Sequence, residues 1–259
     1  TSSLFSNSKL RQIYRSLARA MQLYPDDDPF FLRNLAETLV KAMEDKEAVI
    51  YFEKAARGFA EENLWEESAR SWHTAAVLYG LLDNPRDKGR CLLEATRMSV
   101  SHNNLQAAIE LAESASATFK AAGLVKHNEW ACNQIGALFA AHDLEMAASW
   151  YKRGLQFSSL DSELYGPLLI NLATVGLQRG KLGEAENALE EAKRWAERRS
   201  GPEVDRVMSH QSLLMGLIEY ERRSWRKSQD YFLRCIERSE DLKPEDRATA
   251  WHNLGMIMY

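Results

Sequence analysis

Residues 180–192 read GKLGEAENALEEA, and this stretch decides the fold class. Ala185 and Ala192 are small residues seven positions apart, with the large Leu189 between them. On a helix these three side chains share one face, because residues three, four or seven positions apart are neighbours there. The small residues let a second helix approach closely, while large neighbours fill the space around the contact. With Gly180 as a turn residue ahead of it, the stretch predicts the second helix of an antiparallel hairpin.

The same alternation of small and large residues recurs along the chain. The small residues form four further pairs, which are Ser68 and Ala75, Ala108 and Ala115, Ala147 and Gly154, and Ser228 and Cys235. Near the end, Trp251 opens a W-x2-L-G motif that closes with Gly255. Counted from these positions, repeats start near residues 49, 89, 128, 166, 209 and 248, with spacings of 40, 39, 38, 43 and 39 residues. The last repeat is truncated, and a regular repeat indicates a stacked architecture.

These repeats resemble the tetratricopeptide repeat (TPR) superfamily. The resemblance covers residues 49–259 and implies an all-α fold, a right-handed α-solenoid of stacked antiparallel helix hairpins with about 13 helices. Each repeat is longer than the common unit of about 34 residues, so we expect helices longer by about one turn, or larger loops. Long repeats of variable length resemble those of kinesin light chain. The segment from Tyr51 to Val100 resembles the SNAP adaptor solenoid.

Residues 1–48 do not fit the repeat. The segments Lys9 to Leu23 and Phe30 to Ala42 have helical periodicity, and Asp28 followed by Pro29 is a typical helix start. We therefore expect an irregular helical pair that caps the solenoid or links it to another part. The motif at Gly166 and Pro167 predicts a helix that either starts or bends there. Since the chain starts without Met and stops inside an apolar-periodic segment, we expect a fragment of a longer protein.

The composition gives no sign of attraction to nucleic acid or to an anionic membrane. The 259 residues carry a net charge of −4, and the pI is near 5.9. The sequence contains no run of 18 apolar residues and no secretory signal pattern. Cys91, Cys132 and Cys235 are widely spaced and form no CxxC motif, which is typical of reduced core residues. We expect a cytoplasmic protein with no nucleic-acid or membrane partner.

No residue pattern indicates catalysis, a metal site or a cofactor. The six histidines are scattered, and phosphate-binding loops and nucleophile motifs are absent from the sequence. Two basic segments that contain tryptophan, Lys193 to Arg199 and Arg222 to Lys227, leave nucleic-acid binding open as an alternative. Both lie at expected helix ends, where cations are also favoured by the helix dipole. We predict that the chain is not an enzyme.

The TPR resemblance implies that the first helix of each hairpin lines a binding groove. Position 6 of each repeat then faces the groove, and it holds Lys54, Glu94, Asn133, Asn171, Leu214 and Asn253. Asparagine carries both a donor and an acceptor, so a row of them can hold the backbone of an extended peptide. We predict a peptide-binding site made of Asn133, Asn171, Asn253, Thr174, Gln178, Lys54, Arg57, Arg90 and Arg97. The alternative is structural, because Asn is a common consensus residue at this position and Leu214 interrupts the row.

The cations of this site, Lys54, Arg57, Arg90 and Arg97, belong to the first two repeats. They would suit an acidic or carboxylate-terminated ligand. Arginine–glutamate pairs that join neighbouring helices are the competing explanation, since Glu61 and Glu94 occur among them.

The leading functional hypothesis is a scaffold or adaptor that binds a peptide or helix of a partner protein in the groove, with the oligomeric state left open. The alternative is the sensor or regulatory arm of a larger signalling or effector enzyme whose catalytic domain lies outside this fragment. A third possibility, a SNAP-like disassembly adaptor, would need a membrane-attachment loop and an acidic C-terminal tail. Phe30 and Phe31 are a poor match to the loop, and the sequence shows no such tail.

Overall fold

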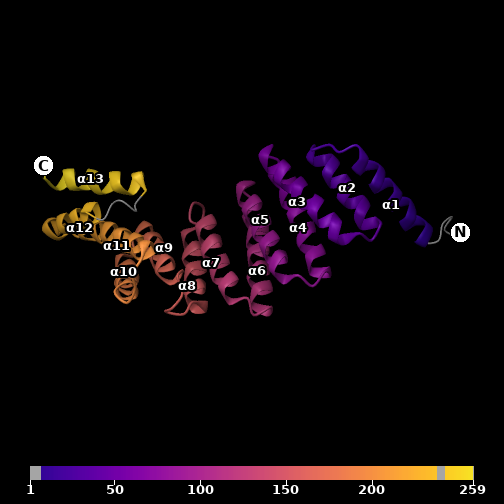
Figure 1. Ribbon diagram of the computed structural model, residues 1–259. Helices are drawn as coiled ribbons and strands as arrows, with labels where there is room; N and C mark the ends of the chain where they lie inside the picture. Colours follow the sequence, from indigo (N-terminus) through magenta and orange to yellow (C-terminus); the bar gives the residue numbers. More distant parts are fainter. Residues whose placement is uncertain (1–6, 238–242, 259) are drawn as a thin grey trace. The chain divides into compact units, whose positions relative to one another are not determined.

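The computed structural model describes residues 7–237 and 243–258, and within these ranges it consists of thirteen α-helices and no strands (Figure 1). The helices are α1 (Asn7–Leu23), α2 (Pro29–Lys41), α3 (Asp45–Glu61), α4 (Trp65–Leu81), α5 (Pro85–Ser101), α6 (Leu105–Ala121), α7 (Val125–Phe139), α8 (Leu144–Phe157), α9 (Tyr165–Gln178), α10 (Leu182–Ala196), α11 (Pro202–Glu221), α12 (Trp225–Glu237) and α13 (Pro244–Met258). The predicted all-α class is confirmed.

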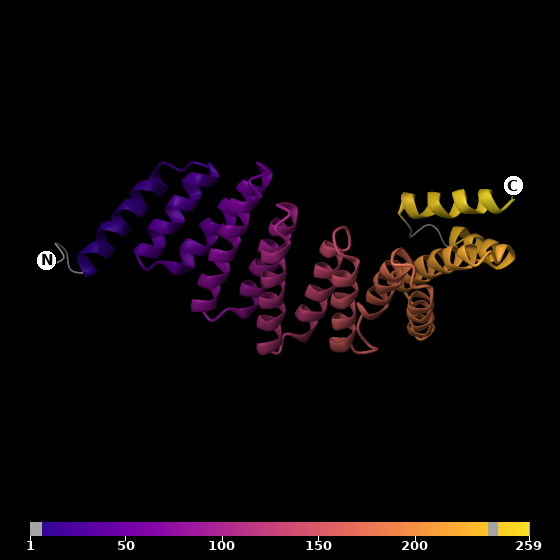
Figure 2. The ribbon, with the colours of Figure 1, turned by 180° about the vertical axis from the view of Figure 1, so that it is seen from behind.

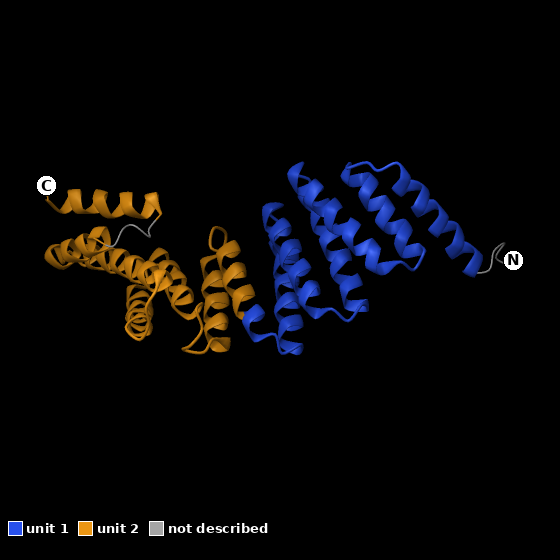
Figure 3. Cartoon of the chain, viewed as in Figure 1, with its two compact units in different colours: residues 1–128 blue, residues 129–259 orange. Residues whose placement is uncertain are grey.

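The helices form two compact units (Figure 3). Unit 1 comprises Thr1–Asn128 and unit 2 comprises Glu129–Tyr259, so the division falls inside α7. Within each unit, consecutive helices pack against one another in the manner of a solenoid. Both ribbon views show α2 to α6 side by side (Figure 2). The expected helical pair before residue 49 corresponds to α1 and α2, and α2 also packs against α3.

Unit 1 has a regular repeat of single helices. Helices α3 to α6 each contain 17 residues and start at residues 45, 65, 85 and 105. A helix of 17 residues plus a connection of three gives a period of about 40 residues per hairpin. The residues beyond the common TPR length therefore lengthen the helices in this unit, which is one of the two outcomes that the sequence predicts.

One type of turn produces the short connections of unit 1. The middle residue has a positive φ, at Asn63 (60°), Asp83 (53°), Asn103 (58°) and Gly123 (67°). After each such residue, the next backbone N–H donates to a carbonyl five residues earlier; Leu64, for example, donates to the carbonyl oxygen of Phe59 at 2.8 Å. This is the hydrogen bond of a Schellman motif, which satisfies the open carbonyls at a helix end.

Unit 2 contains longer connections. Residues 158–164 link α8 to α9, and α11 is lengthened to 20 residues. Helix α9 begins at Tyr165, so Gly166 and Pro167 mark a helix start, one of the two outcomes predicted for them. Pro202 likewise begins α11, after Gly201 with φ of 122°.

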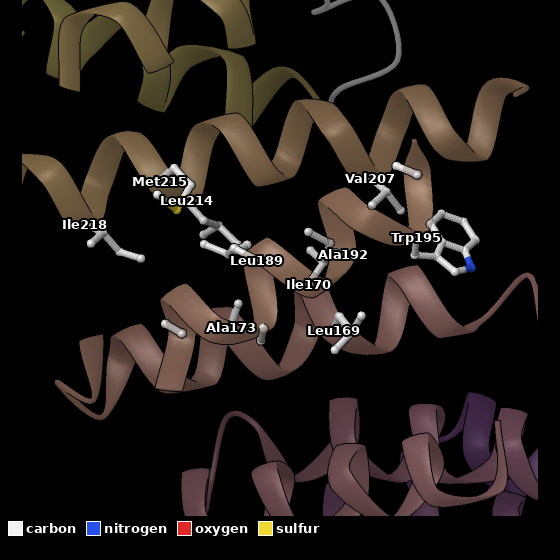
Figure 4. Close-up of a cluster of buried hydrophobic side chains, with 13 residues drawn as sticks. Leu169, Ile170, Ala173, Leu189, Ala192, Trp195, Val207, Leu214, Met215 and Ile218 are labelled. Carbon is white, nitrogen blue, oxygen red and sulfur yellow. The ribbon is translucent and has the colours of Figure 1, made fainter. Parts of the chain in front are cut away.

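The core of unit 2 lies where α9, α10 and α11 meet. It contains Leu169, Ala173, Leu189, Ala192 and Ile218, which are all buried (Figure 4). A Cβ on Gly176 of α9 would lie 3.3 Å from the Cβ of Ala185 in α10. The small residues of the stretch at 180–192 therefore permit the close contact between helices that the sequence predicts.

Candidate protein-binding surface

Asn133 and Asn171 come together on the odd-numbered helices of unit 2. Asn133 lies on α7 and Asn171 on α9, and both side chains are half-buried. The Asn171 Nδ2 donates to the Asn133 Oδ1 at 2.8 Å. The sequence predicts two separate rungs of a ladder, whereas the structure joins the two amides in one pair. Each amide has further hydrogen-bonding capacity, so the pair still has Asn133 Nδ2 as a donor and Asn171 Oδ1 as an acceptor.

Two other predicted residues follow Asn171 on α9. Thr174 lies about one turn further along and is half-buried, and its hydroxyl donates to the Ile170 carbonyl at 2.9 Å. Gln178 lies about two turns along, at the end of α9, and is exposed. Residues three to four positions apart share a helix face. Thr174 and Gln178 therefore extend the surface that starts at the asparagine pair.

Trp130 is a neighbour of this pair that the sequence analysis did not select. It lies three residues before Asn133 on α7, and 43% of its surface is exposed. Large exposed aromatic side chains are over-represented among the residues that carry binding energy in protein interfaces. Its spacing in the sequence indicates this position, because a tryptophan three residues from a proposed groove residue lies on the same helix face.

Asn253 is not joined to this pair by any contact found in the described residues. It lies on α13, and its Nδ2 donates to the Thr249 carbonyl of the same helix at 2.8 Å. Leu214, the residue at the equivalent position of α11, is buried in the core of unit 2. The row of asparagines is thus reduced to one pair.

The cations predicted in unit 1 are mostly held by carboxylates. Glu53 on α3 is only 7% exposed, and it binds Arg57 at 2.7 Å and Arg90 at 2.5 Å. Arg97 pairs with Glu94 at 2.5 Å. A buried carboxylate needs such partners, since leaving it unpaired would cost several kcal/mol. The arginine–glutamate alternative therefore describes these contacts, and the acidic-ligand site stays a prediction.

Lys54 differs from these arginines. Its ammonium lies 5.4 Å from the ring centre of Tyr51, and no ion pair with it is found in residues 7–237 and 243–258.

Glu53 and its partners Arg57 and Arg90 form a cluster, here called the Glu53 cluster. It also includes the hydroxyl of Tyr79, which donates to the Glu53 carboxylate at 2.8 Å. Burial, together with this carboxylate, raises the pKa of Tyr79. Burial raises the pKa of the neighbouring Cys91 to about 12, which keeps its thiol protonated at neutral pH.

Open grooves also lie between successive even-numbered helices. In unit 1, a groove of about 380 Å³ runs between α4 and α6, with Leu92 of α5 at its base. In unit 2, a groove of about 450 Å³ runs between α10 and α12, lined by Met208 and Met215 of α11. These grooves offer a second type of surface, which the sequence analysis did not identify.

No group of three or more His, Cys, Asp or Glu residues could hold a metal ion in the part of the chain that the structure describes. One histidine instead bridges two helices. The Nε2 of His210 lies 3.1 Å from Asp246, which connects α11 to α13. None of the helices within the described ranges is both long and apolar enough to span a bilayer.

The sequence matches the profile of one protein family, described as the soluble NSF attachment protein, SNAP, over residues 14–195. The chain belongs to the SNAP family. The match extends from α1 into the last turn of α10, so it includes both the Glu53 cluster and the asparagine pair. The matched segment is longer than the segment from Tyr51 to Val100, on which the predicted resemblance to this family rests. No curated protein matches the chain.

The fold of this SNAP-family chain is similar to that of solved structures. The apo form of the quorum sensor NprR from B. thuringiensis is similar, with a TM-score of 0.54 and 11% identity, covering 97% of this chain and 68% of that chain. A Rap protein complexed with competence and sporulation factor has a TM-score of 0.50 and 14% identity, covering 96% of this chain and 73% of that chain. At such low identity the similarity shows the fold alone.

Proposed function

We propose that this chain is a protein-interaction adaptor that holds a segment of a partner protein on the odd-numbered helices of unit 2. The site is centred on Asn133 and Asn171, with Thr174 and Gln178 beside them. The observation that carries the proposal is the amide pair, which offers one donor and one acceptor at a half-exposed surface. A peptide unit presents the complementary acceptor and donor, so the pair can bind backbone without reading a sequence.

Trp130 supplies the apolar part of the proposed site. Its exposed ring lies one turn from Asn133, so a partner side chain can bury apolar area there while its backbone meets the amides. Membership of an attachment-protein family supports a binding role rather than a catalytic one. The regulatory-arm alternative would use the same surface and concerns only what is joined to this chain.

Selection from a random peptide library tests the proposal. We expect the intact chain to enrich peptides that bind with one-to-one stoichiometry. The double variant Asn133→Ala with Asn171→Ala should bind them about tenfold more weakly or worse, because each amide contact contributes about 1 kcal/mol. Trp130→Ala should weaken binding further, since truncation of an interface tryptophan often costs about 2 kcal/mol.

The control variant is Gln156→Ala, which changes an exposed side chain on the even-numbered helix α8. It should bind the selected peptides as the unchanged chain does. Melting temperatures are measured on all variants, because the hydrogen bond between the asparagines also ties α7 to α9. A double variant that keeps its affinity but melts several degrees lower would show that the pair is structural and would refute the proposed site.

A further inference from the structure

A cleft of about 800 Å³ lies between the α8–α9 connection and the end of α10. It is lined by Leu160, Asp161, Glu191, Arg194, Trp195, Arg198 and Arg199. The five lining residues from Glu191 onwards follow the spacing of one helix face, continued past the end of α10 at Ala196. One wall of the cleft is therefore formed by α10 and the residues directly after it, and the opposite wall by the α8–α9 connection. The cleft is separate from the surface of Asn133 and Asn171.

Side chains from three places hold the connecting chain in position. Glu129 of α7 is 3% exposed and accepts hydrogen bonds from the hydroxyls of Ser158 and Ser162. The indole Nε1 of Trp195 donates to the Ser162 carbonyl at 3.2 Å. Arg199 donates from Nη2 to the Leu160 carbonyl at 2.7 Å. The cleft is thus preformed, and a ligand would not have to pay for ordering this wall.

Trp195 forms the base of the helical wall. Its ring is 4% exposed and packs at one end of the core of unit 2, next to Val207 (Figure 4). The guanidinium of Arg199 lies 5.0 Å from the centre of the ring. The ring is therefore covered by protein on both sides, and it orients Arg199 rather than contacting a ligand itself.

The charges of the cleft leave two guanidinium groups without a carboxylate. Arg199 lies 3.5 Å from Asp161, and Glu191 accepts a hydrogen bond from the hydroxyl of Tyr165. Arg194 donates from Nε to the carbonyl of Glu190 at 3.3 Å. Neither Arg194 nor Arg198 forms an ion pair within the ranges that the structure describes.

We propose that this cleft binds a phosphate monoester carried on an organic group, such as the phosphorylated side chain of a partner protein. Guanidinium groups match the geometry of phosphate oxygens and bind them with paired hydrogen bonds. A phosphate monoester offers three acceptor oxygens and nearly two negative charges at neutral pH, so it can bind Arg194 and Arg198 together. The cleft has the size of sites for ligands larger than a bare anion, and Leu160 provides an apolar contact for the attached group.

The position of Trp195 disfavours the nucleic-acid alternative for this basic segment. Proteins that hold single strands use exposed aromatic rings on which bases stack. Trp195 is buried and already covered by Arg199. A phosphodiester also has only two non-bridging oxygens and a single negative charge, which makes it the weaker acceptor for two guanidinium groups.

Isothermal titration of the whole chain with phenyl phosphate tests the proposal, with inorganic phosphate and a single-stranded oligonucleotide as comparisons. We expect saturable one-to-one binding of phenyl phosphate, tighter than that of inorganic phosphate and weakened by added salt. Arg198→Ala and Arg194→Ala should each reduce the affinity about tenfold, since a charge-assisted hydrogen bond contributes about 1.5–3 kcal/mol. Arg198→Lys should retain part of the affinity, because it keeps the charge and loses the fork.

The matched control is Arg226→Ala, which removes an exposed arginine from α12 and should leave the affinity unchanged. Both changed arginines of the cleft are exposed, so melting curves should show intact folding. The proposal is overturned if phenyl phosphate does not bind, or if Arg198→Ala binds it as tightly as the unchanged chain. Equal affinity for inorganic phosphate, or tighter binding of the oligonucleotide through the same arginines, would also overturn it. None of these outcomes affects the proposed peptide site on α7 and α9.

Discussion

Four glycines of this chain lie directly beneath an aromatic ring of the following helix. A Cβ added to Gly89, Gly136, Gly166 or Gly216 would lie 2.4–2.6 Å from the nearest ring atom, respectively in Phe119, Tyr151, Trp195 and Phe232. Real Cβ atoms do not approach other atoms so closely, and the rings are buried and cannot move aside. Each of these four helix pairs thus depends on the absence of one methyl group.

Replacement of Gly136 by alanine should therefore destabilise the fold. The new methyl group would lie 2.5 Å from Cε1 of Tyr151, which is 3% exposed. We expect a loss of about 1–3 kcal/mol in the free energy of unfolding, the usual cost of overpacking a core. Urea titration followed by circular dichroism measures it.

Gly183→Ala is the control for this prediction. Gly183 lies in the first turn of α10, and a Cβ there would have no atom within 4 Å. Alanine should be neutral or slightly stabilising at this position, because it is the better helix former. Equal stability of the two variants would contradict the proposed role of the glycine–aromatic contacts.

At the scale of elements, the three-residue turns determine the spacing of the helices. Each turn needs one residue in the left-handed region, and glycine occupies it at Gly123 and Gly180, whereas Met43 and Arg223 occupy it elsewhere. A side chain in this conformation costs about 1–2 kcal/mol for residues other than glycine, asparagine and aspartate. The turns therefore differ in conformational strain, which is higher where Met43 or Arg223 adopts the left-handed conformation.

Met43→Gly should stabilise the chain by relieving this conformation. Met43 has φ of 64° and is 58% exposed, so little packing is lost with its side chain. We expect a gain of about 1 kcal/mol, reduced by the greater freedom of glycine in the unfolded chain. The reverse change, Gly123→Ala at φ of 67°, should destabilise by a similar amount. Thermal melts that shift in the same direction for both variants would refute this explanation of the turns.

At the scale of the whole molecule, buried cysteine thiols and a buried tyrosine hydroxyl make the free energy of unfolding decrease at alkaline pH. Burial raises the pKa of Cys235 to about 11, and those of Cys91 and Tyr151 to about 12. These groups bind their protons more tightly in the folded chain than in the unfolded chain. Their contribution is fully present below the unfolded pKa values, about 8.5 for Cys and 10 for Tyr, and it is lost as pH rises through the folded values.

We therefore expect the free energy of unfolding to be constant near neutral pH with respect to these groups and to fall between about pH 9 and 12. Urea titrations at several pH values measure this fall. In the variant Cys91→Ala with Cys235→Ala, the decrease should be shallower, because two of the titrating groups are gone. A decrease of the same steepness in this variant would show that the thiols do not contribute.

The sequence by itself determined the helices and their pairing into hairpins. The pattern of small and large residues at Ala185, Leu189 and Ala192 is local, and a local pattern is enough to define which face of a helix is buried. The regular spacing of the helix starts in unit 1 also has a local cause, which is the type of turn at Asn63, Asp83 and Asn103. Asparagine and aspartate are typical of such turns, so the residue type at these positions is a local signal of the same period as the packing residues.

The tertiary structure alone decided what the polar residues do, because their partners lie about one repeat away in the sequence. Asn133 and Asn171 were predicted as separate groove residues, and the contact between their amides depends on side-chain conformation across two helices. Arg57 and Arg90 were predicted as groove cations, with ion pairs between helices as the alternative, and it is their distance from Glu53 that shows the ion pairs. The cleft beside Trp195 likewise exists only where the α8–α9 connection folds back onto α10. Charge and hydrogen bonding are set by distances in space, which the spacing along one helix does not contain.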